Sequence, residues 1–281
     1  MNKLKLGIIG MGNMGKGHFQ NVIEGKCPSV EITAVSDINP DRLSHLSEYS
    51  SVTCFTNTIE MLDSGLIDAA LIAVPHYDHP TYAIECFKRG IHVLTEKPAG
   101  VYTRQVREMN EAAEKSGVKF GIMFNQRTNP LYAKAREIVQ SGQLGTPKRL
   151  VWIITNWYRT QAYYDSGSWR ATWNGEGGGV LLNQAPHNLD LWQWIFGMPK
   201  RIRAFFNIGK YHNIDVEDDV TIYGEYENGG VFRFLNANFA LLQHRGSLLL
   251  NQPTSSLPIR NLMGILWFLK HLPNQFLAVQ I

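Results

Sequence analysis

Residues 4 to 125 alternate short apolar runs with amphipathic stretches, and this alternation limits the possible fold more than any other feature of the chain. Such a pattern predicts βα units repeated around a parallel sheet. The intervening stretches carry helix signals, because Pro40 suits a first helical turn and Gly90 suits a helix C-terminus. We therefore expect an α/β domain with a doubly wound parallel sheet over residues 1–125. The apolar runs are LKLGII, EITAVS, AALIAV, HVLT and KFGIM.

After Arg127 the apolar segments become longer and richer in aromatic residues. A hairpin turn is predicted at Asn228-Gly229-Gly230, and one long helical segment, VLLNQAPHNLDLWQWIF, interrupts the strands. We expect a second, α+β domain over residues 126–232, with an open, mostly antiparallel and incomplete sheet. The predicted strand segments are RLVWIITNWY, RIRAFFNI and DDVTIYGEYENGGVFRF.

Charge argues against a polyanionic partner. The 281-residue chain carries a formal charge of +3, but four basic residues and no acidic residue lie from Asn228 onward. That leaves 23 of the 27 basic residues against all 24 acidic ones in the rest of the chain. We therefore expect no nucleic-acid partner.

The three cysteines, Cys27, Cys54 and Cys86, lie within or beside apolar stretches and lack metal-ligand spacing. We expect buried thiols in a reducing compartment and no metal site. The first apolar run is shorter than a signal-peptide core, and no uncharged apolar run reaches the roughly 18 residues of a spanning helix. These observations predict a cytoplasmic protein without membrane contact.

A glycine-rich turn follows the first apolar run. Gly10 permits a tight turn, Gly12 allows close approach of a pyrophosphate, and Gly15 allows the next helix to pack against the strand. The residues Asn13 and Met14 would open that helix, whose N-terminal amides attract phosphate. The spacing predicts a dinucleotide-binding turn.

Asp37 ends the second apolar run, 22 residues after Gly15, near the spacing at which a carboxylate meets the adenine ribose. A carboxylate there would repel a 2′-phosphate, so we expect NAD, with NADP less favoured. The alternative is a glycine turn followed by an unrelated aspartate that caps a helix.

Two other strand ends carry candidate cofactor residues. Pro75 and His76 follow the run AALIAV, and Glu96 and Lys97 follow HVLT. The carboxyl edge of a doubly wound sheet is where ligands bind. A lysine there can exchange the proton of a substrate hydroxyl when its surroundings lower its pKa. The alternative is an exposed lysine paired with Glu96.

The segment NQAPHNLD offers a second candidate, because helical spacing would place Asn183, His187 and Asp190 on one face. His187 suits acid–base chemistry or a hydroxyl contact, although a lone helical histidine is often structural. Asp190 is expected to orient His187 or to serve the fold. Pro186 predicts a kink or a late helix start.

An aromatic and arginine-rich segment at residues 157–173 precedes this motif. Flat aromatic faces suit the C–H surface of a sugar ring, and arginines suit hydroxyls or a carboxylate. The alternative is an aromatic filling of an interface. The candidate substrate wall consists of Arg159, Tyr163, Trp169 and Arg170, with Tyr164 and Trp173 beside them.

The chain resembles the glucose-fructose oxidoreductase / inositol dehydrogenase family (Gfo/Idh/MocA) in GIIGMGNMGKGH, AVPHYDHPTYAIECFKRGIHVLTEKPAG and GEGGGVLLNQAPHNLDLWQWIFGMP. The resemblance covers roughly residues 4 to 232. It implies a Rossmann domain and a substrate domain in an NAD(P)-dependent oxidoreductase acting on sugars or cyclitols, with a homodimer or homotetramer built through the open sheet.

The resemblance also implies roles for single residues. It makes Lys97, in the EKP motif, catalytic, and it puts Asn125 and Arg127 at a position that lines the nicotinamide pocket. Family members often carry aspartate where this chain has Asn183. An amide cannot take a proton, so we expect Asn183 to orient substrate and His187 to share catalysis with Lys97.

The tail, residues 233–281, departs from the family pattern and lacks acidic residues. We hypothesise a frameshift or truncation there, with a membrane- or partner-binding helix at 261–272 as the competing explanation. Two other functions stay open beside the dehydrogenase. One is a catalytically silent dinucleotide-binding protein or decayed enzyme, and the other is an NAD-dependent glycosidase.

Overall fold

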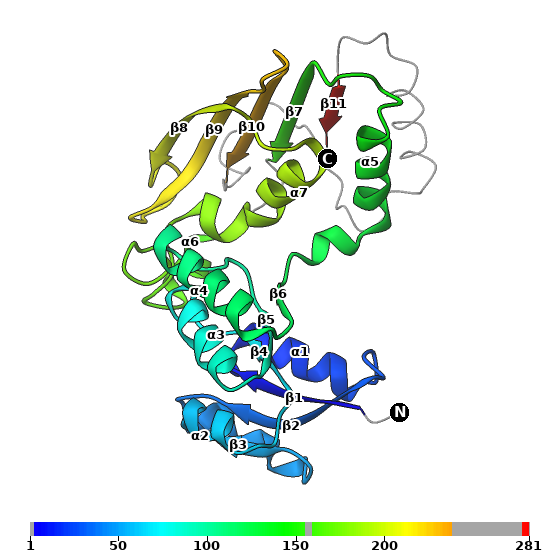
Figure 1. Ribbon diagram of the computed structural model, residues 1–281. Coiled ribbons are helices and arrows are strands. Elements are labelled where there is room, and N and C mark those ends of the chain that lie inside the picture. Colours follow the sequence, from blue (N-terminus) through cyan, green and yellow to red (C-terminus); the bar gives the residue numbers. More distant parts are fainter. Residues whose placement is uncertain (1–2, 155–158, 238–276, 281) are drawn as a thin grey trace. The chain divides into compact units, whose positions relative to one another are not determined.

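The computed structural model describes residues 3–154, 159–237 and 277–280 (Figure 1). It divides into two compact units. Unit 1 comprises Met1–Phe124 and Gly175–Gly177, and unit 2 comprises Asn125–Asn174 and Gly178–Ile281. The proposed helix at 261–272 and most of the tail lie outside the described residues.

Unit 1 is built on a parallel sheet of six strands in the order β3-β2-β1-β4-β5-β6. The topological switch point of this sheet lies between β1 and β4. Ligands of such sheets bind outside the carboxyl ends of the strands beside that point. The doubly wound parallel sheet is therefore confirmed. Its strands are β1 (Leu4–Ile9), β2 (Val30–Ser36), β3 (Thr53–Phe55), β4 (Ala69–Ile72), β5 (His92–Thr95) and β6 (Phe120–Ile122).

Helices cover both faces of this sheet because its strands are apolar on both sides. Ile8 faces a core that includes Phe19 of the first helix, whereas the neighbouring Ile9 faces a second core that includes Met61 and Met109. The helical elements are α1 (Asn13–Ile23), η1 (Pro40–Arg42), η2 (Ser44–Glu48), α2 (Thr58–Asp63), η3 (His76–Asp78), α3 (His79–Lys88) and α4 (Thr103–Ser116).

The structure of unit 1 differs from the sequence-based predictions in three features. The strand β3 was not predicted, because three residues carry too little pattern. The helical stretch at 40–49 forms two short 3₁₀ helices, η1 and η2, instead of one α-helix. Cys27 and Cys54 are exposed, and only Cys86 is buried. Cys27 sits between Lys26 and Pro28, whose neighbourhood is polar and turn-forming.

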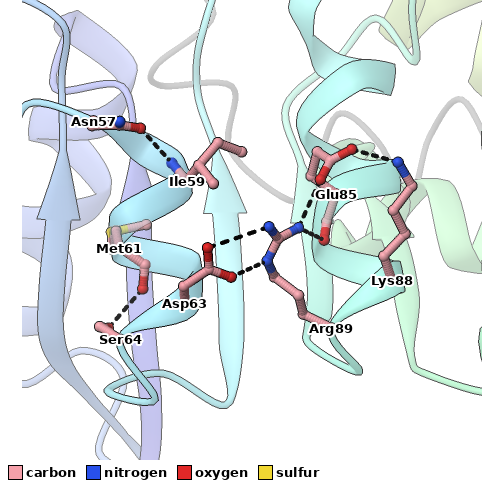
Figure 2. Close-up of polar contacts among 8 residues, drawn as sticks. All are labelled: Asn57, Ile59, Met61, Asp63, Ser64, Glu85, Lys88 and Arg89. Atoms are coloured by element: carbon pink, nitrogen blue, oxygen red, sulfur yellow. Dashed lines mark hydrogen bonds and ion pairs between the residues drawn. The ribbon is translucent and has the colours of Figure 1, made fainter.

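Arg89 ties α2 to α3, as Figure 2 shows. Its Nε lies 2.6 Å from Oδ1 of Asp63, and one terminal nitrogen lies 2.7 Å from a carboxylate oxygen of Glu85. The same nitrogen donates to the Glu85 backbone carbonyl at 3.0 Å, near the end of α3. Lys88 adds a second contact to Glu85 at 2.6 Å. Hydrogen bonds from Lys88 and Arg89 hold the pKa of Glu85 below its usual value.

Unit 2 contains a mixed sheet in the order β11-β7-β10-β9-β8. The strand β9 pairs antiparallel with β8 and β10, while β7 pairs parallel with β10 and β11. The predicted hairpin joins β9 to β10, with Gly229 at a φ of 77°. The strands are β7 (Arg149–Ile154), β8 (Arg201–Ile208), β9 (Glu217–Glu225), β10 (Val231–Ala237) and β11 (Leu277–Gln280).

The core of unit 2 lies between this sheet and two helices. Trp192 stacks on Phe232 with ring centroids 3.7 Å apart, and its indole nitrogen donates to the Tyr226 hydroxyl at 2.5 Å. Edge strand β8 is exposed along its whole length. The helical elements are η4 (Asn125–Thr128), α5 (Pro130–Gln140), α6 (Gln161–Asp165), the π-helix η5 (Val180–Gln184) and α7 (Pro186–Phe196).

Candidate functional site

The glycine turn between β1 and α1 is shaped by close backbone contacts. Gly10 has a φ of 92°, and a Cβ there would lie 2.6 Å from the carbonyl oxygen of Ala73. A Cβ on Gly15 would lie 1.9 Å from the carbonyl oxygen of Gly10. By contrast, a Cβ on Gly12 would meet no protein atom within 4 Å. Gly10 and Gly15 thus pack tightly against neighbouring backbone, whereas Gly12 faces open space. A turn that binds phosphate requires this arrangement.

Helix α1 begins directly after Gly12, so Asn13 and Met14 lie in its first turn. Met14 is 54% exposed and belongs to the open side of the turn. The first amides of a helix have no partner within it, which leaves donors and the positive end of the dipole for phosphate oxygens. The chain's own residues therefore fit a dinucleotide at this turn.

Asp37 follows β2 and is 5% exposed. Its Oδ2 accepts the Met11 amide at 2.7 Å and lies 3.3 Å from the Arg42 guanidinium, while its Oδ1 accepts the Asn39 amide at 2.9 Å. A carboxylate has about four acceptor sites, so capacity remains for a ribose hydroxyl. Asp37 thus also fixes the glycine turn through Met11, a role that its spacing did not predict.

Lys97 follows β5 at the carboxyl edge of the sheet and is partly buried. Glu96 beside it is 6% exposed and accepts the Lys97 amide at 3.2 Å. Its Oε1 also lies 2.7 Å from Nε2 of His18 on α1. Burial acts to raise the pKa of Glu96, but the contacts with His18 and Lys97 outweigh burial, so the pKa lies below its usual value. Glu96 is therefore an ionised carboxylate that joins α1 to the lysine segment.

The end of β4 carries Pro75 and His76, as the sequence indicated. His76 is buried, and its Nδ1 lies 2.9 Å from the carbonyl oxygen of Glu176, itself 2% exposed. A second histidine, His79, opens α3 and is 1% exposed. The His76 ring is buried within unit 1, where it contacts the Glu176 carbonyl. This structural contact stands beside the predicted role of His76 near the cofactor.

In unit 2, the motif NQAPHNLD spans two kinds of helix. Asn183 lies in the π-helix η5, and α7 begins at Pro186, so His187 and Asp190 lie in a different helix from Asn183. The late start at Pro186 is confirmed, whereas the single regular helix through all three residues is wrong. The physical reason is that Pro186 has no amide to donate and suits a first helical turn.

The π-helix begins where Gly179 meets β9. A Cβ on Gly179 would lie 1.9 Å from the backbone oxygen of Glu217. The buried Glu217 side chain accepts the amides of Gly179 and Leu181 at 3.0 and 3.1 Å. This carboxylate supplies the partners that the helix start lacks and so sets the position of the segment that leads to Asn183.

Arg127 in η4 forms a two-pronged contact with Asp190 in α7. Nε lies 2.7 Å from Oδ2, and a terminal nitrogen lies 2.5 Å from Oδ1. The Asp190 side chain is 7% exposed and that of Arg127 is 41% exposed. Arg127 therefore holds η4 to α7, and the structure ties Asp190 to Arg127. Asn125 opens the same short helix.

The predicted substrate wall assembles around one tyrosine. The guanidinium carbons of Arg159 and Arg170 each lie 4.6 Å from the ring centroid of Tyr163, and Arg170 also donates to the Tyr163 hydroxyl at 2.9 Å. Arg170 lies 4.7 Å from the Trp169 ring. All four predicted residues thus form one cluster in unit 2. Residues 157 and 158 of this segment lie outside the described part.

Sequence reasoning missed several buried polar residues beside these sites. Asp218, fully buried, accepts the amides of Lys210, Tyr211 and His212 and contacts the His212 ring at 3.2 Å. The other missed residues are His18, His79 and Glu217. The available signals were the acidic run EDD at the start of β9 and single histidines in α1 and at the start of α3, and none is specific without tertiary contacts.

The described residues contain neither a cluster of metal ligands nor a membrane-spanning helix. Across residues 3–154, 159–237 and 277–280, no group of three or more His, Cys, Asp or Glu side chains is arranged to hold a metal ion. In the same part of the chain, no helix is long and apolar enough to cross a membrane.

The fold and the glycine turn define a two-unit protein whose first unit is a Rossmann-type nucleotide-binding unit. Residues 4–124 match the oxidoreductase family with an NAD-binding Rossmann fold, and residues 132–248 match the GFO/IDH/MocA C-terminal domain. The chain belongs to the Gfo/Idh/MocA family. The second match extends past Arg233, beyond the limit of the resemblance expected from the sequence.

The relatives include a rhizopine catabolism protein and an inositol dehydrogenase. The rhizopine catabolism protein MocA of Rhizobium meliloti is 29% identical over 70% of this chain and 58% of its own length. Inositol 2-dehydrogenase of Rubrobacter xylanophilus is 28% identical over 68% of this chain and 52% of its own. The chain thus spans little more than half the length of these relatives.

A solved relative shows both the fold and bound ligands. The WlbA dehydrogenase of Chromobacterium violaceum, in complex with NADH and UDP-GlcNAcA, is 28% identical with a TM-score of 0.78. The similarity covers 86% of this chain and 69% of that one. Unit 1 is accordingly an NAD-binding domain.

Proposed function

We propose that this protein is an NAD-dependent dehydrogenase that oxidises a hydroxyl of a sugar, sugar derivative or cyclitol. The observation that carries the proposal is Lys97, a partly buried lysine at the carboxyl edge of the NAD-binding sheet, next to the ionised and buried Glu96. The resemblance to inositol and sugar-nucleotide dehydrogenases supports the substrate class.

NAD, when bound, accepts a hydride from the carbon that bears the hydroxyl. In this proposal Gly10, Gly12 and Gly15 bind the pyrophosphate with the first amides of α1, and Asp37 binds the adenine ribose. Lys97, as a neutral amine, takes the hydroxyl proton at Nζ, which prevents a protonated carbonyl from forming as hydride leaves. The adjacent carboxylate of Glu96 gives Lys97 an anionic neighbour. Pro75, His76 and Asn125 line the cofactor in the same proposal.

Unit 2 supplies the substrate contacts in this proposal. His187 acts as the second proton-handling residue, because an imidazole can donate or accept near pH 7. Asn183 orients a substrate hydroxyl. The cluster combines aromatic rings with two guanidinium groups, and this chemistry suits a sugar ring with an acidic substituent. Its members are Arg159, Tyr163, Trp169 and Arg170. Arg127 acts through its contact with Asp190.

The proposal includes a homo-oligomer in the cytoplasm, formed through the sheet of unit 2. Its support is the edge strand β8, on which Ile202, Phe205, Phe206 and Ile208 are each 52–58% exposed. Apolar side chains of this size on an unpaired strand edge mark association surfaces. Light scattering on the purified protein and on Phe205→Lys would test it, and a monomer for both would overturn it.

The decisive experiment measures NADH formation at 340 nm with NAD and a panel of inositols, aldoses, sugar acids and sugar nucleotides. Lys97→Met, which keeps the length of the side chain without its charge, is the matched variant. We expect turnover with one substrate class and its loss in Lys97→Met, with NADH binding by fluorescence unchanged. Release of an aglycone without net NADH would instead favour the glycosidase. NADH binding without any turnover would favour the silent binding protein.

A further inference from the structure

His79 connects two strand ends at the carboxyl edge of the NAD-binding sheet. Its ring is 1% exposed, and its Nδ1 lies 2.7 Å from the carbonyl oxygen of Pro98. Its Nε2 lies 2.9 Å from the carbonyl oxygen of Val74. Val74 follows β4 and Pro98 follows β5, so one side chain at the start of α3 joins the backbone after both strands.

Carbonyl oxygens only accept hydrogen bonds, which limits what this ring can do. A neutral imidazole has one N–H and satisfies one of the two carbonyls, whereas an imidazolium satisfies both. The pKa of His79 lies below its usual value, mainly because the ring is buried and with a contribution from the charge of Lys97. The two carbonyl contacts and the charge of Glu96 oppose this shift without cancelling it. The carbonyl of Pro98, the residue next to Lys97, is reached by the proton on Nδ1, which is present in the imidazolium and in the Nδ1–H tautomer of the neutral ring.

The contact between the His79 ring and the Pro98 carbonyl is important for the position of Pro98. Proline lacks an amide hydrogen, so its carbonyl is the only backbone polar group that Pro98 can use to fix its place. The following segment also packs on the start of α3, since a Cβ on Gly100 would lie 2.8 Å from the Pro80 ring. Holding the Pro98 carbonyl therefore limits the freedom of the backbone on one side of Lys97. On the other side, Glu96 is held by His18.

We propose that His79 is a positioning residue for Lys97: its Nδ1–H donates to the Pro98 carbonyl and fixes the backbone from which the lysine projects. The inference rests on the proposed function, in which Lys97 exchanges the substrate proton. A misplacement of about 1 Å can lower a rate about 100-fold, so a contact one residue away is sufficient to matter.

Two amide variants separate this role from simple filling of space. In His79→Asn the side-chain amide nitrogen falls near the place of Nδ1 and can still donate to Pro98. In His79→Gln it falls near the place of Nε2 and can donate only towards Val74. His45→Gln, at an exposed histidine in η2, is the matched control. The unfolding temperature and the Kd for NADH are measured for each protein.

The first readout does not require turnover. The rate at which Lys97 reacts with an amine-specific reagent is followed against pH by peptide mass spectrometry, with the other lysines as internal references. We expect His79→Gln to shift the pH midpoint of Lys97 labelling, while His79→Asn and His45→Gln leave it unchanged. Equal midpoints for His79→Asn and His79→Gln would overturn the proposal.

The second readout is kcat with the substrate found by the panel. We expect a loss of about 100-fold in His79→Gln with a KM within about threefold, and a loss of about tenfold or less in His79→Asn. Equal losses that follow the unfolding temperature would mean that His79 serves stability alone. Absence of turnover in the unaltered protein would remove the proposed dehydrogenase, but the labelling result would still decide whether His79 positions Lys97.

Discussion

Nε2 of His18 lies 2.7 Å from Oε1 of Glu96, the residue directly before Lys97. His18 lies on α1, the helix that follows the glycine turn. The side chains of His18 and Glu96 are 19% and 7% exposed, so water screens the interaction between them only weakly. The contact links α1, which binds the pyrophosphate in the proposed function, to the segment that carries the lysine. It was not visible in the sequence, where 78 positions separate the two residues.

Replacing His18 with Leu should leave the Glu96 carboxylate buried without this partner. We expect the free energy of unfolding at pH 7 to fall by about 1–3 kcal/mol, the usual cost of a buried polar group left unsatisfied. His18→Gln, which keeps a donor, should lose less. Urea denaturation of both variants and of the exposed-site control His45→Leu measures the difference.

The same variant should show a defined pH dependence. The pKa of Glu96 in the folded protein lies below its reference value of 4.5, so its contribution to stability is present above about pH 4.5 and is lost as the pH falls through the folded value. The gap between His18→Leu and the unaltered protein should therefore persist above about pH 4.5 and shrink as the pH falls below that value. A gap that widens in acid would contradict this account.

Gly12 and Gly15 form a matched pair for testing the phosphate turn. A Cβ on Gly15 collides with the Gly10 carbonyl, so Gly15→Ala should cost about 3 kcal/mol of stability or prevent folding. Gly12 has a φ of −73° and open space at its Cβ, so Gly12→Ala should cost about 0.5 kcal/mol or less.

The Kd for NADH separates the two glycines further. The proposed function places the pyrophosphate next to Gly12, so the added methyl group of Gly12→Ala should lower affinity about tenfold, or about 1.4 kcal/mol, in a folded protein. Fluorescence titration with NADH measures this, and thermal unfolding provides the control. Unchanged affinity in Gly12→Ala would mean that the pyrophosphate does not approach this turn.

The three thiols should react in a fixed order. Cys27 and Cys54 are exposed, whereas burial raises the pKa of Cys86 to about 12. Burial also raises the pKa of Cys54, so Cys27 should react first. Titration with a chromogenic disulfide reagent at pH 8 should label two thiols in the native protein and the third only after urea is added. Three fast thiols in the native state would contradict the fold of α3.

Arg127 and Asp190 should respond unequally to truncation. Arg127→Ala leaves a carboxylate that is 7% exposed without its partner, whereas Asp190→Ala leaves a guanidinium that water can reach. We expect losses of about 2–3 and about 1–2 kcal/mol respectively, and a coupling of about 1–2 kcal/mol in a double-mutant cycle. Denaturation of the four proteins measures these values. Additive losses would mean that the paired geometry contributes nothing.

Local sequence patterns predicted the parts of this fold that local chemistry determines. The turn from β1 to α1 follows from glycines at fixed spacing, and the hairpin at Asn228-Gly229-Gly230 follows from residues that accept a positive φ. The late start of α7 follows from Pro186. Each depends on the backbone preference of one or two residues.

Other features depend on contacts between distant segments and had no local pattern. The short strand β3 exists because β2 offers it an edge, and the π-helix η5 begins where Gly179 meets the backbone of Glu217. The pairing of His18 with Glu96, and of His79 with Pro98, requires helices and strand ends that only the folded sheet brings together. The residues around Lys97 were therefore harder to predict than Lys97 itself.

The three residues Gly175–Gly177 belong to unit 1 although 50 residues of unit 2 precede them in the chain. A gene fragment that stops at Phe124 would encode the whole parallel sheet but omit Glu176, whose carbonyl faces the buried His76 ring. Such a fragment would expose a ring that the intact chain keeps covered. Anyone who wishes to transplant this nucleotide-binding unit into another protein has to bring the distant tripeptide with it.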